Sequence, residues 1–156
     1  MFITPNDIAD AFEALIAEKF PGERVYRNLV PADFARPSTL IVQDQVKGRP
    51  DFGCSSIQML ATFTITTFVE TDDYRHSHLQ ALHLRQMTIA GLLMPGFIKV
   101  GDRAPKITDF SLGGGYDYDT VTVTVSYTLD RNDFMSLPQY PLVGELHMNE
   151  EVRTYG

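Results

Sequence analysis

The sequence has little of three things: cysteine, long apolar runs and clustered basic residues. Its single cysteine, Cys54, cannot form an internal disulfide and has no partner thiolates for a zinc site, which favours folding in a reducing compartment. No apolar run approaches the roughly 20 residues that a membrane span needs, so we expect no membrane role. The first residues, MFITPNDIADAF, lack the basic flank of a signal peptide, so we do not expect secretion either.

Acidic residues are in excess instead. The 156 residues include 20 acidic and 13 basic side chains, which gives a net charge of −7. Binding along a nucleic-acid backbone needs clustered lysine and arginine, so specific nucleic-acid binding is disfavoured. The length and the apolar content of 44% are those of one ordinary globular domain.

The first half of the chain predicts one helix and three strands. Thr4 suits the helix cap, Pro5 suits the first helical position, and Asp7 suits the carboxylate of a capping box. Apolar residues then recur at helical spacing until Pro21-Gly22 ends the pattern. We therefore expect a helix over residues 4–20 and strands over residues 25–29, 38–45 and 57–70.

The strand at residues 57–70 has the clearest pattern of the first half. Its apolar residues alternate with Thr62, Thr64 and Thr66, which is typical of a strand with one buried face. Threonine on the second face suits a surface that is partly wet or docked on another subunit. The preceding segment, VKGRPDFG, is punctuated by glycine and proline and predicts a loop.

The second half predicts a helix and three more strands. Thr71 can cap a helix over residues 72–94, in which one stripe consists of Leu79, Leu82, Gln86, Ile89 and Leu93. Strands are expected over residues 97–100, 106–112 and 120–129, with the glycines at 113–115 as a flexible hairpin tip between the last two.

Together these elements predict an α+β domain over residues 1–130, in the order α-β-β-β-α-β-β-β. We expect a mostly antiparallel sheet with two main helices packed on one face, because most strands follow one another through turns rather than helices. The last stretch, residues 131–156, lacks clear periodicity and carries Pro138 and Pro141. It predicts an extended C-terminal arm.

Histidines and acids on the second helix raise the question of a metal site. Five such residues lie within a short stretch: Asp72, Asp73, His76, His78 and His83. Asp72 and His76 are one turn apart, but His78 would point elsewhere and no metalloenzyme motif is present. A solvated polar helix face is the simpler interpretation, and a small metal-dependent enzyme stays an alternative.

Other motifs of catalysis are missing. The three glycines before YDYD lie between two strands, whereas a phosphate loop needs them before a helix, and Asp117 and Asp119 would repel phosphate. No nucleophile elbow exists, and Cys54 has no histidine near it in sequence. We therefore expect no enzymatic activity and no cofactor or metal.

The stretch VPADFARPSTLIV, residues 30–42, combines an aromatic, a basic residue and a proline before a strand. Pro37 has no N–H to donate and suits the first position of that strand. Phe34 is expected to anchor the loop in the core, and Asp33 lies close enough to Arg36 for a local ion pair. Arg36 would then be able to reach a neighbouring subunit, so replacing it with alanine is expected to weaken assembly more than folding.

The order of these segments is similar to that of a known family. The first helix leads to RVYRNL, then to the pattern aromatic-x-basic-Pro-small at residues 34–38, then to the alternating strand ATFTITTFVE. A leucine-rich helix and a final strand pair complete the order. Over residues 4–130 the chain resembles the tail terminator proteins of long-tailed phages and prophages.

The resemblance implies a virion structural protein that forms a homo-hexameric ring. Such a ring caps the tail tube, ends its polymerisation and joins the tail to the head connector. The implied partners are further copies of the chain, the tail-tube protein and a connector or neck protein, with DNA only passing through the channel. The implied location is the tail or neck of the virion, and the host cytoplasm during assembly.

Two alternatives stay open beside the metal-dependent enzyme: another head–tail joining or neck protein of the same particle, and a soluble ligand-binding domain. If the ring forms, six copies carry a net charge of about −42, and an acidic lumen would keep passing DNA from sticking. The candidates for contact with another subunit, the tube or the connector are Phe34, Arg36, Lys47, Arg49, Tyr116, Phe134 and Tyr140.

Overall fold

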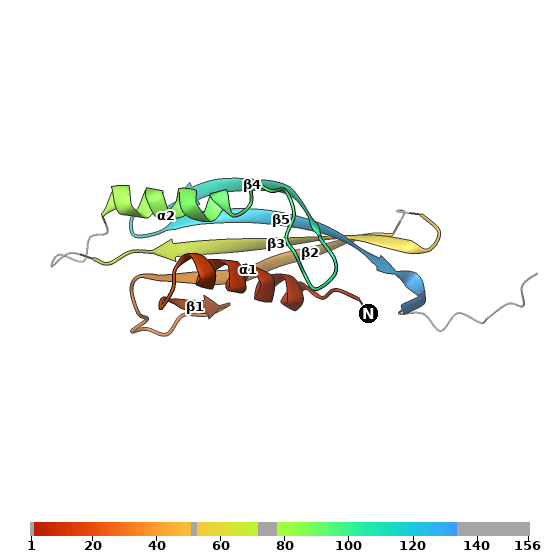
Figure 1. Cartoon of the computed structure of the whole chain (residues 1–156), viewed down its shortest axis with the longest axis horizontal. Coiled ribbons are helices and arrows are strands. Elements are labelled where there is room, and N and C mark those ends of the chain that lie inside the picture. The colour runs from red at the N-terminus through yellow and green to blue at the C-terminus, as the bar shows by residue number, and fades with distance from the viewer. Residues whose placement is uncertain (1, 51–52, 72–77, 134–156) are drawn as a thin grey trace, which may run out of the picture.

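A computed structural model describes residues 2–50, 53–71 and 78–133, which form an α+β fold with one five-stranded sheet (Figure 1). The elements are α1 (Pro5–Lys19), β1 (Arg24–Arg27), β2 (Ser38–Arg49), β3 (Ser56–Phe68), α2 (Leu79–Gly91), β4 (Lys106–Gly114), β5 (Asp119–Asp130) and a 3-10 turn (Arg131–Asp133). The predicted fold class is confirmed. Among these residues, no helix is long and apolar enough to cross a membrane.

The strand order in the sheet is β1-β2-β3-β5-β4, and all but one of the pairs are antiparallel. The exception is the edge pair, in which β1 lies parallel to β2 with Arg24 beside Ser38. Asn28 follows β1 with a left-handed φ of 65°, and its N–H donates to the carbonyl oxygen of Ile41 at 2.9 Å. The loop over residues 28–37 then leads back to the end of the sheet at which β1 began, so the parallel pair is connected without a helix.

The pairing of β3 with β5 places one side of both strands in the core. Ile65 lies beside Val121 and Phe63 beside Val123, and all four side chains are buried. Phe12 of α1 meets Phe63 edge-on, with ring centroids 5.7 Å apart. Helix α1 packs over β1 and β2 and helix α2 over β3 and β5 (Figure 1), so both helices cover the same face, as predicted.

The opposite side of these two strands forms what we call the threonine face. It consists of Thr62, Thr64 and Thr66 on β3 and Thr120, Thr122 and Thr124 on β5. The six side chains are only partly exposed, because they pack against each other across the strands, and the Thr62 and Thr124 hydroxyls lie 3.3 Å apart. Within the described part of the chain, neither helix packs on this face.

The predicted end of the strand that starts at Ser38 was wrong. Strand β2 continues to Arg49, so the first half of VKGRPDFG is strand rather than loop, since Val46 pairs with Ala61 and Gly48 with Met59. This β2–β3 hairpin projects past both helices (Figure 1).

The predicted strand at residues 97–100 is also absent. Phe97 and Val100 make only isolated bridges, to Lys106 and Arg103. Gly96 and Gly101 on either side have φ values of 83° and 61°, so the chain turns twice within a few residues and no ladder can form.

The helix starts follow capping chemistry. The predicted capping box of α1 is present: the backbone N–H of Thr4 donates to Asp7 Oδ2 at 2.8 Å, and the Thr4 side chain accepts from the Asp7 N–H. The bond from the Thr4 backbone N–H lowers the pKa of Asp7, as does the bond from the Thr4 hydroxyl. Helix α2 begins later than predicted, with His78 as its cap rather than Thr71, and Asp72 to Ser77 lie outside the described residues.

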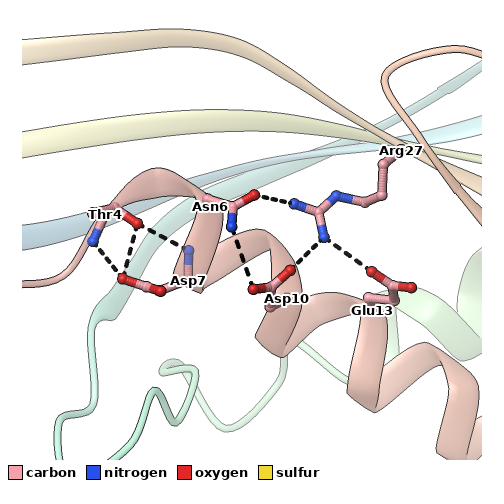
Figure 2. Close-up of polar contacts among 6 residues, drawn as sticks. All are labelled: Thr4, Asn6, Asp7, Asp10, Glu13 and Arg27. Atoms are coloured by element: carbon pink, nitrogen blue, oxygen red, sulfur yellow. Dashed lines mark hydrogen bonds and ion pairs between the residues drawn. The ribbon is translucent and has the colours of Figure 1, made fainter.

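Arg27 fastens the short edge strand β1 to α1. One nitrogen of its guanidinium donates to Asp10 at 2.7 Å and to Glu13 at 2.9 Å, and the other donates to Asn6 at 2.9 Å (Figure 2). Burial lowers the pKa of Arg27, but the bonds to the two carboxylates outweigh it and raise the pKa above its ordinary value.

Arg85 joins α2 to the turn between α1 and β1 and to β3. Its guanidinium donates to Glu23 at 3.0 Å and to Thr67 Oγ1 at 2.7 Å, and it stacks 4.1 Å from the centre of the Phe20 ring. The side chain of Arg85 is only 11% exposed and that of Glu23 only 21%. Both charged groups are therefore largely shielded from water. Through its bonds to Glu23 and Thr67, Arg85 connects the α1–β1 turn, β3 and α2.

The capping box gives a prediction that depends on pH. Because the pKa of Asp7 is lower in the folded than in the unfolded chain, its carboxylate stabilises the fold above pH ~4, and this contribution is lost as the pH falls through the lower folded value. We expect Asp7→Asn to lower the free energy of unfolding by about 0.5–1 kcal/mol at pH 7 and by less at pH 2.5. Urea titrations at both pH values measure this. Glu18→Gln, an exposed change on the same helix, is the control, and an equal loss at both pH values would contradict the role of the charge.

The ion pair of Arg85 gives a second prediction. Arg85→Met should cost about 3 kcal/mol of stability, because it leaves the Glu23 carboxylate poorly exposed and without its guanidinium. Adding Glu23→Gln should recover part of this loss, since no charge is then left unpaired. Urea unfolding of the two single variants and the double variant tests it, and strictly additive losses would show that the two side chains do not interact.

Candidate interaction site at one end of the sheet

The candidate site is built on the stretch that precedes β2. Phe34 packs against Phe68 with ring centroids 4.7 Å apart and meets Tyr26 edge-on at 6.5 Å. The Tyr26 hydroxyl accepts a bond from the Ala35 N–H at 3.0 Å. Phe34 thus anchors this loop, but the predicted position in the core was wrong, because Phe34 is only partly buried and packs on Phe68 and Tyr26 outside the core cluster. The aromatic cluster holds Arg36 over the end of β3.

Arg36 binds the hairpin between β4 and β5. Its guanidinium donates to Asp117 Oδ2 at 2.7 Å and to the carbonyl oxygen of Val69 at 3.2 Å. It also lies 4.9 Å from the centre of the Phe34 ring and 5.3 Å from that of Phe68, which are cation–π distances. The predicted ion pair with Asp33 was wrong, because Arg36 points across the fold to a residue 81 positions away.

The glycines before this hairpin have a different role from the flexible tip that we predicted. Gly113 and Gly114 are the last residues of β4, and the turn proper is Gly115 to Tyr118, closed by a 2.8 Å bond from the Gly115 N–H to the Tyr118 carbonyl. A Cβ at Gly114 would collide with the Asp119 carboxylate. Glycine is therefore required there so that Asp119 can lie against the backbone of β4.

Helix α2 holds the same hairpin from the other side. Asp119 is buried, and one of its oxygens lies 2.7 Å from His83 Nδ1. The side-chain amide of Gln86 donates to the carbonyl oxygens of Gly113 at 2.7 Å and Thr120 at 3.0 Å. Gln86, which we placed with four apolar residues in one stripe of the helix, donates to β4 and β5 and so links α2 to both strands.

The histidines of α2 have structural partners. His78 Nδ1 accepts from the Ala81 N–H at 3.3 Å, and His83 pairs with Asp119. Asp72, Asp73 and His76 lie outside the described residues. Among the residues that are described, no group of three or more histidine, cysteine or acidic side chains could hold a metal ion.

The predicted interface residues fall into three groups. Phe34 and Arg36 are partly buried in the aromatic cluster. Lys47 and Arg49 are exposed on the projecting β2–β3 hairpin, and Tyr116 is 72% exposed at the β4–β5 turn. Phe134 and Tyr140 lie outside the described residues, so their contact role stays a prediction.

A surface pocket of about 440 Å³ lies between the start of α1 and the loop that follows Phe97. Its lining mixes apolar groups with Asp7 and Asp10, whose carboxylates are already engaged in the cap of α1 and with Arg27. It brings no nucleophile next to a base.

No family model matches the chain, and no curated protein sequence matches it significantly.

Sequence reasoning missed the two charged partners that matter most here, Arg85 for Glu23 and Asp117 for Arg36. Each pair joins residues more than 60 positions apart, so nothing local signals it. The aromatic, basic and proline order at residues 34–37 was a usable signal for Arg36 itself, but not for its partner.

Arg36 gives a prediction that reverses our expectation from sequence. Because its guanidinium joins β2, β3 and the β4–β5 turn, we expect Arg36→Ala to lower the free energy of unfolding by about 1–3 kcal/mol. Arg36→Lys should restore only part of this, since an ammonium cannot bind Asp117 and stack on two rings at once. Urea unfolding measures both variants. An unchanged midpoint for Arg36→Ala would show that the contacts of Arg36 with Asp117 and the two rings do not stabilise the fold.

Proposed function

We propose that this chain is a virion structural protein, a tail terminator that caps the tail tube as a homo-hexameric ring and meets the head connector. The observation that carries the proposal is the incomplete sheet. One face, the threonine face, has no described helix on it, and β4 at one edge has a strand on one side only. Such surfaces suit a subunit that is completed by its neighbours.

The order of elements supports the same proposal. It keeps the N-terminal helix, the aromatic and basic loop before β2, the long alternating β3, the leucine-bearing helix and a final strand pair, on which the resemblance to tail terminators rests. The two described histidines near α2 also favour a contact role over the alternative of a metal-dependent enzyme. His78 caps α2 and His83 binds Asp119, so both have structural partners.

The β2–β3 hairpin is the element that we assign to contact along the ring or with the tube. It projects past the helices and exposes Lys47 and Arg49 on a chain whose net charge is −7 (Figure 1). Basic side chains at the tip of an acidic subunit favour docking on the acidic surface of another copy or partner. The acidic lumen stays a prediction.

The test of the ring is its mass in solution combined with negative-stain imaging, alone and with assembled tail tubes. We expect hexamers with a central hole, free or seated on the tube end. A chain that stays monomeric in both settings would contradict the proposal.

Charge reversal on the hairpin refines this test. Lys47→Glu with Arg49→Glu should leave the unfolding midpoint unchanged, because both side chains are exposed, and should reduce ring formation or tube capping by tenfold or more, about 1.4 kcal/mol. Lys99→Glu with Arg24→Glu makes the same change of net charge at two exposed positions away from the hairpin and is the matched control. Equal effects of the two changes would show that only net charge matters.

A further inference from the structure

Exposed apolar side chains are concentrated on one flank of the molecule. Among the described residues, all but two of the large exposed apolar side chains lie on α2, on the turn after it, or on β4 and its hairpin; the exceptions are Phe2 and Leu29. The members of this α2–β4 surface are Leu79, Leu84, Met87, Met94, Phe97, Phe110, Leu112, Tyr116 and Tyr118. A gathering of this kind on an otherwise polar domain marks a docking surface.

The same flank contains an open sheet edge. Strand β4 pairs with β5 on one side, and on its outer side only its first residues are covered, where Phe97 bridges Lys106 and the Ile107 N–H donates to the Gly96 carbonyl at 2.9 Å. From Thr108 to Gly114 the outer backbone meets no other described strand. This stretch has a bulge near Thr108 and one charge, Asp109, but no lysine or proline to discourage a further strand.

Two hollows lie between α2 and this edge. One, of about 380 Å³, is lined by Leu93, Met94, Ile107 and Phe110 among others. The second, of about 300 Å³, includes Leu112 and the glycines that follow it. A strand added to an edge presents alternate side chains to one face, and hollows beside the edge are where such side chains fit.

The residues beyond Asp133 have the composition of such an added strand. The segment FMSLPQYPLVGELHMNEEVRTYG is rich in apolar side chains over its first half. Pro138 and Pro141 exclude it from the middle of a sheet. They are three residues apart, so their nitrogens face opposite sides of an extended strand, and only one of them can face away from β4. The added ladder is therefore short and is interrupted at the other proline. Fully extended, it would reach roughly 75 Å, more than enough to span a neighbouring subunit.

The starting point of the segment favours a neighbouring copy over its own chain. Strand β5 ends at Asp130, and the Arg131 N–H is tied to the Ser55 carbonyl at 2.8 Å, beyond the end of the sheet at which β4 begins. At that end the Gly96–Phe97 turn already covers the outer side of β4. A segment from the same chain has to pass around this turn before it can reach the open part of β4.

We propose that the α2–β4 surface is the docking site for residues 134–156 of a neighbouring copy, which adds a strand along the outer side of β4 and fills the two hollows with its apolar side chains. The proposal rests on the proposed ring, since the ring supplies the neighbour.

The test uses full-length chains in a Cys54→Ser background, which contain no other cysteine. One protein carries Leu112→Cys, and a second carries a single change of Leu137→Cys, Tyr140→Cys or Leu142→Cys. After mixing and mild oxidation, we expect at least one pair to give a disulfide-linked dimer. Leu29→Cys, which is 82% exposed but outside the α2–β4 surface, replaces Leu112→Cys in the matched control and should give none.

A second measurement uses assembly. Ending the chain after Asp133 should lower ring formation at least tenfold, and so should changing Phe110→Ser with Leu112→Ser. The two side chains are 38% and 44% exposed, so the serine variant also loses some stability, and ring formation is compared at a temperature at which both variants are folded. Leu29→Ser should leave ring formation unchanged. A peptide of residues 134–156 should slow hydrogen exchange in β4 of the truncated chain.

The outcomes separate this inference from the proposed function. Rings that form normally without residues 134–156, with no cross-link above the control, overturn the docking proposal and leave the terminator proposal standing. A further variant carries Leu112→Cys and Leu142→Cys in the same Cys54→Ser chain; if it gives only a disulfide within one chain while the mixed single variants give no dimer, the neighbour is overturned as the source. No rings and no capped tubes from the parent chain overturn the function, and the docking proposal falls with it.

Discussion

The side-by-side register of β3 and β5 is the constraint on which the rest of the structure depends. Both strands alternate apolar and hydroxyl-bearing residues, and their pairing aligns Phe63 with Val123 on one side and Thr64 with Thr122 on the other. Only one face of the sheet is thus apolar enough to bury two helices, and α1 and α2 both pack there. A shift of one residue in this pairing would turn valines to water and threonines to the core.

Around this core, two arginines join parts of the chain that the sheet alone does not hold together. Arg85 connects α2 to Glu23 and to the hydroxyls of β2 and β3, while Arg36 connects the loop before β2 to the β4–β5 turn. Both guanidinium groups stack on aromatic rings, which keeps them well placed with little exposure to water. A buried ion pair adds less net stability than its short distance suggests, because both charges lose their hydration. It does restrict the joined segments to one relative arrangement, since any other would leave a buried charge unpaired.

What the core leaves uncovered determines the functional interpretation. Two helices cover one face of a five-stranded sheet, so the threonine face, the outer side of β4 and the projecting β2–β3 hairpin stay available for contact. The exposed apolar side chains gather beside the open edge rather than at random. The two flanks of the molecule also differ, because one is apolar while β1 at the other edge is fastened to α1 by Arg27. The proposed ring needs two different surfaces of this kind on each subunit.

The sequence by itself determined the α+β class, the capping box of α1, the two-sided pattern of β3 and β5 and the anchoring of Phe34, because these depend on spacing within a few residues. Only the tertiary structure decided the parallel pair of β1 and β2, the extent of β2 to Arg49, and the turns that replace a strand at residues 97–100. It also decided that Arg36 binds Asp117 and that Gly114 makes room for Asp119. Such contacts join residues far apart in the chain, and they form only once the sheet has brought its ends together, so no local pattern of residue types encodes them.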